Sequence, residues 1–402
     1  MKKRVLTLFA LASLSLATFT VVSCSDDDNN NNTENTTPST FVVNRDNLTG
    51  EINDGDVVLE SGTYKLTGKL IVKSGAKLII KPGVIIEATA VTKENTAIRY
   101  IAVAQGGEID VQGTASNPVI MTSTTKTPGS WGGLVLCGKA TINKGATASA
   151  EVSELTYGGT LDTDTSGTIQ YLRIEYPGYA YNSEKEFNGI SFFGVGNGTK
   201  VENVEVYESS DDGFEFFGGT VNTKNLVVIN TSTAVVGDDL FDWTEGWKGT
   251  NENWYGKRTN GGARGVEADN NSNNHNASPV SNPTIKNLTL IGNGAGTENH
   301  AIKLRVGTKG KFDNVVLSNW GTGFDVEHTE TTTYANNGEL KATRVKFDNV
   351  LTRTSGKLTA PSSTVPGDKI NVDKVFSEDA TATGAGNGTS IPAWAQNWTV
   401  GI

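Results

Sequence analysis

The chain has 402 residues, of which 36% are hydrophobic and 46 are glycine, and its formal net charge is −10 at pH 7. Such a composition favours many short strands joined by turns over a set of long helices. The negative charge argues against nucleic acid as a partner and against direct electrostatic attraction to anionic lipid.

Residues 1–23 have the order of a lipoprotein signal peptide. Basic residues at positions 2–4 are followed by an apolar run, and small residues lead to Cys24. The apolar run is too short and ends too abruptly to cross a membrane. Cys24 supplies the thiol that carries the lipid in such proteins. We therefore expect a chain held at the outer membrane through lipid on Cys24 and facing the cell exterior.

Residues 24–40 consist, after the cysteine, of Asp, Asn, Thr, Ser, Pro and one Glu, and contain no aromatic residue. A segment of this composition buries too little apolar surface to become ordered, so it is predicted to be a flexible tether. Residues 355–402 lie beyond the repeats described next, and we expect them to form a C-terminal tail or a cap on the last coil.

A two-strand unit recurs through the middle of the chain. Short apolar runs separated by Gly-containing turns fill Leu66–Ile86 and Ile101–Thr122. Similar nine-residue segments then begin at Thr168, Lys200, Asn222, Thr284, Lys311 and Lys346. Their spacing, 22 to about 35 residues with one long excursion, indicates a solenoid. The sequence predicts an all-β, right-handed parallel β-helix over residues 41–354, with a long loop at about 244–264.

Five of the six segments carry an asparagine before the central apolar residue. These are Asn203, Asn225, Asn287, Asn314 and Asn349. Equivalent residues of stacked coils lie about 4.8 Å apart and form ladders. We expect these amides to bond one another or the turn backbone, because buried polar groups in turns need partners.

An acidic motif occurs twice, as Asp211-Asp212-Gly-Phe-Glu215 and as Asp238-Asp239-Leu-Phe-Asp242. Stacking of the two copies would bring like charges together, which raises carboxyl pKa values unless a cation lies between them. One interpretation is therefore a calcium site, since hard cations bind several oxygen ligands. Its ligands would be Asp211, Asp212, Asp238 and Asp239. The alternative is that these aspartates cap turns and face solvent.

The same carboxylates allow an enzymatic interpretation, in which Asp212, Asp239 or Glu215 act as acid and base in cleaving a glycan. Together with His300 and the nearby Lys303, the layout faintly resembles the polygalacturonase type of β-helix. It lacks that type's upstream Asn-Thr-Asp block and its His-Gly pair, so no catalytic residue is assigned from it.

The segment 243–264 is rich in Asn, Gly, Lys and Arg around Trp247, Trp254 and Tyr255. Exposed aromatic rings beside amides are a common way to hold sugars, so we predict that these three residues and Asp242 bind a ligand. The alternative is that the rings fold back and pack the loop onto the solenoid.

Three blocks carry a family resemblance: Gly129–Gly133, Ser210–Gly219 and Leu240–Trp247. They are similar to blocks of Bacteroidetes surface lipoproteins with a right-handed parallel β-helix, and the aspartates after Cys24 resemble the export signal of such proteins. The resemblance implies fold and surface placement but no settled activity. Our leading hypothesis is non-catalytic binding of carbohydrate or another surface polymer. The alternatives are a polysaccharide hydrolase or lyase, and a structural or adhesive protein.

Overall fold

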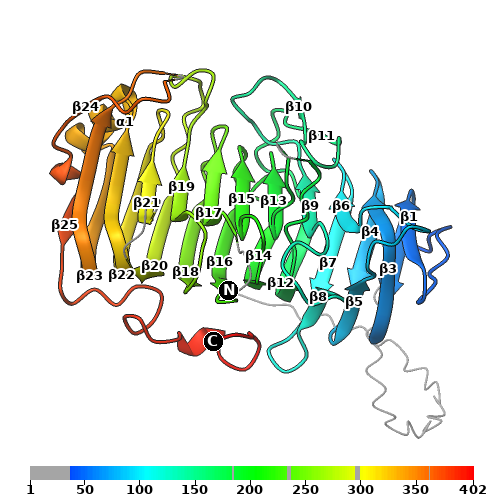
Figure 1. Cartoon of the computed structure of the whole chain (residues 1–402). Helices are drawn as coiled ribbons and strands as arrows, with labels where there is room; N and C mark the ends of the chain where they lie inside the picture. Colours follow the sequence, from blue (N-terminus) through cyan, green and yellow to red (C-terminus); the bar gives the residue numbers. More distant parts are fainter. Residues whose placement is uncertain (1–36, 183–184, 233–236, 295–298, 362) are drawn as a thin grey trace, which may run out of the picture. The chain divides into compact units, whose positions relative to one another are not determined.

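The computed structural model describes residues 37–402, except for 183–184, 233–236, 295–298 and 362. The described residues form a right-handed parallel β-helix, whose coils follow one another in chain order (Figure 1). The fold prediction is thus confirmed. The coils form three parallel faces, in which each strand pairs with its equivalent in the next coil.

Face 1 carries the site described below. It consists of β1 (Leu48–Ile52), the end of β3 (Gly62–Val72), β6 (Tyr100–Val103), β9 (Leu134–Cys137), β13 (Ile190–Phe193), β15 (Phe214–Phe217), β17 (Asp239–Thr244), β19 (Arg264–Ala268), β21 (His300–Leu304) and the last parts of β22 (Gly310–Glu327) and β23 (Leu340–Leu358).

Face 2 consists of β2 (Gly55–Leu59), β4 (Ala76–Ile80), β7 (Glu108–Gln112) and the first residues of β12 (Gly167–Glu175), β14 (Lys200–Tyr207), β16 (Asn222–Asn230), β18 (Thr250–Arg258), β20 (Thr284–Gly294), β22 and β23. Face 3 consists of the start of β3, β5 (Val84–Ala88), β8 (Val119–Ser123), the ends of β12, β14, β16, β18 and β20, and the middle of β22 and β23.

The smaller elements lie outside these faces. They are the hairpin of β10 (Ala148–Ser149) and β11 (Thr156–Tyr157), the helix α1 (Thr329–Asn337), β24 (Asp368–Lys369), two 3-10 helices (Asp373–Val375 and Ala393–Ala395) and β25 (Phe376–Glu378). No helix in the described part of the chain is long and apolar enough to span a membrane.

The repeated asparagines lie at the corner between face 2 and face 3. Asn203 and its equivalents have φ between 57° and 61°, a left-handed conformation that asparagine tolerates better than most residues. Each amide donates to the carbonyl oxygen of the preceding one at 2.8 Å, in the order given next. The ladder is Asn203, Asn225, Asn253, Asn287 and Asn314. The predicted pairing of amides is therefore confirmed for four of the five positions.

Asn349 does not belong to that ladder. It donates to Asn319 at 2.7 Å, at a second corner, where the end of face 3 bends towards face 1. In this coil the first corner is occupied by Arg344, with φ 54°. The main ladder also contains Asn253, which the sequence did not predict as a member. Asn253 lies within the segment that the sequence suggested was a loop.

The segment 244–264 is not a long loop. It contains β18, a complete strand of faces 2 and 3 whose Trp254 pairs with Leu226 on one side and Leu288 on the other. The ring of Trp254 stacks on Phe241 at 4.5 Å between centroids, and that of Trp247 stacks on Phe216 at 4.0 Å. Apolar burial inside the solenoid thus outweighs the loop-like composition of the segment.

The C-terminal tail first covers the last coil and then turns back along face 3. Val372 and Val375 are buried at the end of the solenoid, as a cap requires. Residues 379–402, here called the C-terminal strap, then cross towards earlier coils (Figure 1). Near its end, the Val400 N–H donates to both carboxyl oxygens of the buried Glu205 at 2.9 and 3.0 Å. The strap therefore turns the outside of face 3 into a second apolar core.

Part of the predicted tether is also held in place. Thr37 donates its backbone N–H to Asp56 at 2.7 Å, and Thr40 donates its backbone N–H to Asp54 at 2.8 Å. The prediction of a flexible tether is therefore wrong for residues 37–40. Residues 24–36, Cys24 among them, lie outside the described residues.

Candidate functional site on face 1

One outward position of face 1 carries a charge in five successive strands. Neighbouring residues pair in register from β15 to β22. We call these five the charged row: Glu215, Asp242, Glu267, Lys303 and Asp325. The apolar residues that alternate with them, such as Phe214 and Phe216, point into the core, as strand geometry requires.

The beginning of the row is acidic. We define the acidic half as Asp211, Asp212, Glu215, Asp238, Asp239 and Asp242. Carboxylate oxygens of Asp212, Glu215 and Asp242 lie within 4.8 Å of one another. A second such group joins Asp211, Asp212 and Asp238, and a third joins Asp239 and Asp242 to Glu267.

The predicted quartet of calcium ligands is therefore divided. Asp211, Asp212 and Asp238 converge, but Asp239 belongs to the group that lies further along the row. The physical reason is that the carboxylate of Asp239 bonds the following coil, where it accepts the backbone N–H of Arg264. Glu215 and Asp242 take part instead, because they occupy the same outward position in adjacent strands.

Asp212 and Asp239 also hold the coils in register. The carboxylate of Asp212 accepts the backbone N–H of Asp239 at 2.7 Å, and the carboxylate of Asp239 accepts that of Arg264 at 2.6 Å. Asp212 is 6% exposed and Asp239 is 1% exposed. Both carboxylates bond the backbone of the following coil and are buried, so neither residue faces bulk solvent as that alternative expects.

Burial and mutual repulsion make ionisation of the acidic half unfavourable. Burial raises the pKa of Asp211 to about 8, and the charges of Glu186 and Asp238 contribute to that shift. The pKa values of Glu215 and Asp242 lie well above their ordinary values, first because of burial and then because of neighbouring carboxylates. Burial and the charges of Asp211 and Asp238 act in the same direction on Asp212. Such carboxyl groups require a proton or a cation among them.

One oxygen in this half has no hydrogen-bond partner. Asp242 Oδ1 is inaccessible to solvent and is not bonded to any other described residue. Nearby, the Asn188 amide donates to Glu215 at 2.6 Å, which favours the charged form of that carboxylate. The oxygen atoms available at Asp212, Glu215 and Asp242 are of the kind that a hard divalent cation prefers.

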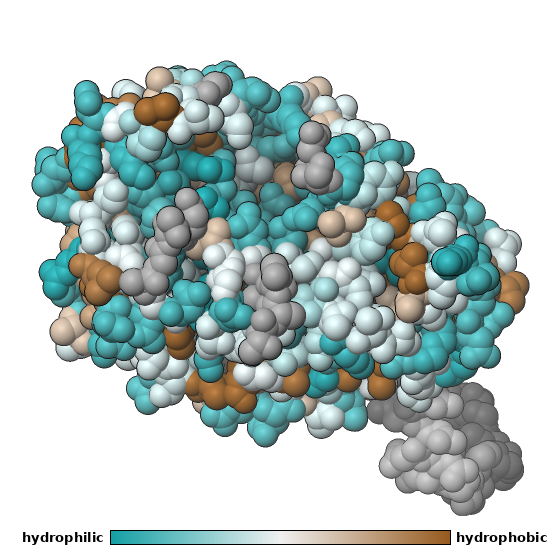
Figure 2. Space-filling model, in the orientation of Figure 1, coloured by the Kyte–Doolittle hydropathy of each residue, from teal (hydrophilic) through white to brown (hydrophobic). Residues whose placement is uncertain are grey.

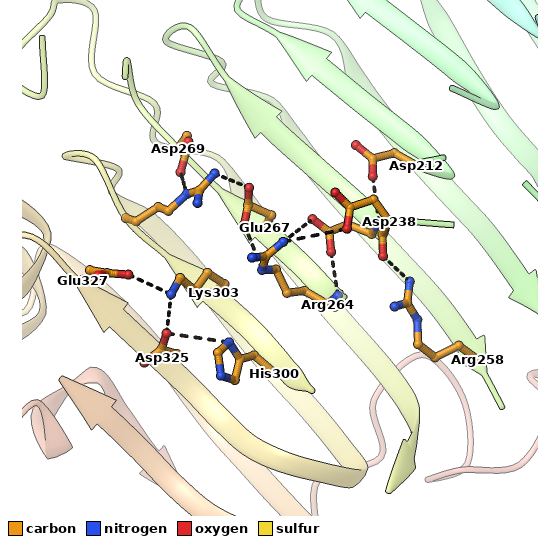
Figure 3. Close-up of polar contacts among 12 residues, drawn as sticks. Asp212, Asp238, Arg258, Arg264, Glu267, Asp269, His300, Lys303, Asp325 and Glu327 are labelled. Carbon is orange, nitrogen blue, oxygen red and sulfur yellow. Dashed lines mark hydrogen bonds and ion pairs between the residues drawn. The ribbon is translucent and has the colours of Figure 1, made fainter. Parts of the chain in front are cut away.

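The rest of the row is compensated by basic side chains. We define the paired half as Arg264, Glu267, Asp269, Lys303, Arg305, Asp325 and Glu327. Lys303 contacts Asp325 at 2.6 Å and Glu327 at 2.8 Å (Figure 3). Arg305 binds Asp269 at 2.8 Å and also contacts Glu267. His300 lies 3.6 Å from Asp325.

Arg264 marks the boundary between the two halves. Its guanidinium contacts Glu267 at 2.9 Å on one side and Asp239 at 3.7 Å on the other (Figure 3). Burial raises the pKa of Glu267 to about 7, although Arg305 and Arg264 act in the opposite direction. Beyond Arg264, at Asp325 and Glu327, the carboxyl pKa values are lowered instead of raised. Burial opposes ionisation of Glu327, but Lys303 and Thr359 outweigh it and lower its pKa to about 2.

The aromatic residues proposed to bind a ligand do not lie at this site. Trp247 and Trp254 are 0% exposed and stack inside the solenoid. Tyr255 points out of face 3, where the C-terminal strap covers it. The prediction of an exposed aromatic platform is therefore wrong, and the packing alternative is correct. Asp242, the fourth residue of that prediction, does lie in the acidic half.

Sequence reasoning missed Arg264 and Glu267. The signal was present as a constant spacing of three residues, because Arg264 and Glu267 repeat the arrangement of Asp239 and Asp242. The surrounding segment was interpreted as a loop, which hid this equivalence.

Two chemistries fit the acidic half. Carboxylates from consecutive coils supply oxygen ligands for a divalent cation. Carboxyl groups about 5 Å apart, one protonated and one charged, also satisfy a requirement for glycoside cleavage. Figure 2 shows a largely hydrophilic surface with only scattered apolar patches on the side of the molecule seen in Figure 1.

Comparison with family models gives one match. A model described as a pectate-lyase-like beta helix domain matches residues 50–399. Comparisons with curated proteins and with solved structures give no match.

Proposed function

Because the chain belongs to the family of pectate-lyase-like β-helix domains, we propose that it binds a polysaccharide on face 1, at the acidic half of the charged row. The family name refers to an enzyme of pectate, which is an acidic polysaccharide. The observation that supports this location is the group formed by Asp212, Glu215 and Asp242, whose oxygens converge within 4.8 Å on an accessible part of the row. Binding without cleavage is the simplest use of this arrangement.

A divalent cation such as calcium is part of this proposal. Three carboxylates would hold it, and the unpartnered Asp242 Oδ1 supplies an oxygen that nothing else in the described chain satisfies. Calcium takes six to eight oxygen ligands, so a site with three carboxylates leaves positions for water or for sugar oxygens. A bound cation would also remove the repulsion that otherwise keeps an anionic polymer away from this acidic surface.

Two measurements test the proposal together. Calcium binding is measured by isothermal titration calorimetry, and binding to pectate and to neutral polysaccharides is measured by affinity electrophoresis with and without calcium. Asp242→Asn should weaken calcium binding by about tenfold or more, since it removes one charged ligand. It should weaken polysaccharide retention in parallel.

Glu252→Gln is the matched control, because Glu252 is a carboxylate on face 2 whose side chain is 47% exposed and pairs with Lys224 at 3.3 Å. It should leave both measurements unchanged. Retention that is equal in wild type, Asp242→Asn and the control would contradict binding at the acidic half.

A second candidate function is glycan cleavage by Asp212, Asp239 or Glu215. The observation in its favour is the proximity of carboxyl groups whose pKa values are raised by burial, since a general acid must keep its proton near neutral pH. Product analysis on acidic and neutral glycans distinguishes the two functions. Cleavage predicts products that disappear in Glu215→Gln and Asp212→Asn, whereas binding alone predicts no products from the wild type.

We also propose that the chain is a lipoprotein of the outer membrane, anchored through Cys24 and facing the exterior. The support is the signal-like order of residues 1–23 and the polar residues that follow. Mass spectrometry of the N-terminal peptide should find acyl chains on Cys24, and Cys24→Ala should release the protein from the membrane fraction. An unmodified Cys24 in membrane-bound protein would contradict this anchor.

A further inference from the structure

A second cleft opens on face 1, near the N-terminal end of the solenoid. Its volume is about 270 Å³, close to the lower limit of small-molecule sites. It is lined by Lys69, Ala97, Ile98, Tyr100, Val152, Ser153, Glu154 and Tyr181. These residues come from β3, β6 and three loops, so strands form the floor of the cleft and loops form its walls.

Two tyrosines give this cleft its character. Tyr100 belongs to β6, is 6% exposed and packs against Phe187 with 5.0 Å between ring centroids. Tyr181 is 46% exposed, which makes it the most exposed aromatic residue in the described part of the chain. An exposed ring beside a fixed one offers a flat apolar surface with polar edges, which suits the face of a sugar ring.

The charged groups of the cleft have opposite signs. Lys69 and Glu154 are both exposed, and neither forms an ion pair with another described residue. An ammonium group donates hydrogen bonds and a carboxylate accepts them, so together they match both roles of a sugar hydroxyl. A neutral sugar fits this balance better than a strongly charged one, because the two side chains offer no net charge to neutralise.

The cleft is separate from the acidic half. Starting at β6, face 1 continues through β9 and β13 to Glu215 in β15, which is three strand spacings, or about 14 Å. Between the two positions the outside of face 1 is covered. Val152 and Phe187, from two different loops, pack there with Val135 and Ala102 in one apolar cluster.

We propose that this cleft, here called the tyrosine cleft, is a second carbohydrate subsite that binds a neutral pyranose unit. The sugar ring stacks on Tyr181, while its hydroxyls bond Lys69 and Glu154. The proposal rests on the proposed function only for the class of ligand, since the residues of the acidic half do not take part. Its place beyond the covering loops would let one polymer, or a branch of it, be held at two points.

The test uses the protein with neutral hexaoses of glucose, xylose and mannose, and with hexagalacturonate as the acidic probe. Binding is measured by isothermal titration calorimetry. We expect at least one neutral hexaose to bind, and Tyr181→Ala to weaken it about tenfold through loss of the stacking surface. Tyr181→Phe should retain most of the affinity, because the ring remains. Lys69→Ala should weaken binding severalfold.

Two further variants make the outcome decisive. Leu351→Ala removes an exposed apolar side chain elsewhere, 68% exposed, and should change nothing. Glu215→Gln should leave binding of the neutral hexaose unchanged, even where it abolishes calcium-dependent retention of pectate. The proposal is overturned if no neutral hexaose binds, or if the affinity is the same in wild type and Tyr181→Ala. Either result leaves the function proposed for the acidic half to its own test.

Discussion

The two halves of the charged row share one backbone geometry but differ in how their charges are balanced. In the acidic half, Glu215 and Asp242 face each other in register with no basic residue between them. In the paired half, Lys303 stands in register between Glu267 and Asp325 and contacts the latter. The same ladder of outward positions therefore goes with raised pKa values of Glu215 and Asp242 in one half and with lowered pKa values of Asp325 and Glu327 in the other.

This difference indicates which half is suited to a ligand. Buried carboxylates paired with Lys or Arg are satisfied within the chain, and such networks stabilise a surface without requiring a partner. Carboxylates that face one another keep the folded chain less stable than it would be with neutral residues. Strained titratable groups of this kind are typical of functional sites. Removing charges from either half tests this difference between them.

Lys303→Met is the change with the largest expected effect. Lys303 is 5% exposed, and the Asp325 side chain that it contacts is fully buried. Removing the ammonium leaves Asp325 and Glu327 without their main partner, which should lower the free energy of unfolding by about 3–5 kcal/mol. Urea unfolding followed by fluorescence of the buried tryptophans measures this change. Lys224→Met, on an exposed pair of face 2, should cost less than about 1 kcal/mol.

Arg264→Gln tests whether Arg264 separates the acidic half from the paired half. The guanidinium contacts Glu267 and Asp239, so its loss extends the acidic half by one strand. We expect the free energy of unfolding to fall by about 2 kcal/mol, because the two carboxylates lose a partly buried counter-charge. Calcium should restore more stability to this variant than to wild type. An equal response to calcium in both proteins would show that Arg264 does not separate the halves.

Much of the fold could be predicted because its signals are local. Short apolar runs between Gly-containing turns, repeated along the chain, predicted the stacked strands of a parallel β-helix, as observed. The repeated asparagine predicted a ladder, since equivalent positions of stacked coils must coincide. Asn253 was missed because Trp254, Gly and charged residues around it have the composition of a loop, whereas their burial depends on aromatic partners in other coils.

The site was only partly predictable for the same reason. The two copies of the acidic motif were predicted to stack, and Glu215 does lie in register with Asp242. Whether a carboxylate pairs with Lys or Arg depends on which residue of the adjacent coil lies in register with it. That register is a property of the stacked structure. The tyrosine cleft could not be predicted from the sequence at all. Tyr100 and Tyr181 are far apart in sequence, and only the covering loop brings them to one cleft.

Glu215→Gln should have a smaller and opposite effect to Lys303→Met. Replacing a carboxyl group whose pKa is raised by burial and by Asp212 removes repulsion, so the free energy of unfolding at pH 8 without calcium should rise by about 1 kcal/mol. Stabilisation by added calcium should decrease in the same variant, because a ligand is lost. A loss of stability without calcium would mean that the hydrogen bond from Asn188 outweighs the repulsion.

The smallest expected effect is on the pH dependence of stability, where the two halves should act in different ranges. Burial raises the pKa of Asp211 to about 8, so this group binds a proton in the folded state that the unfolded state has already released. Its contribution is complete below the unfolded pKa of about 4 and is lost as the pH rises towards 8. Glu327 behaves in the opposite way, since its pKa near 2 gives a contribution that is lost only as the pH falls below about 4.

Between pH 5 and 8 in the presence of a chelator, the acidic half and Glu267 at its boundary should therefore change the melting temperature, whereas Glu327 should not. We expect that temperature to fall as the pH rises, and Asp211→Asn to reduce the fall by about 2 °C. Asp46→Asn, at an exposed position near the first coil, removes the same charge and should keep the wild-type slope. If both variants reduce the slope equally, net charge and not the acidic half determines the pH dependence. If only Asp211→Asn does so, repulsion within the acidic half is its source, and saturating calcium should produce the same flattening in the wild type.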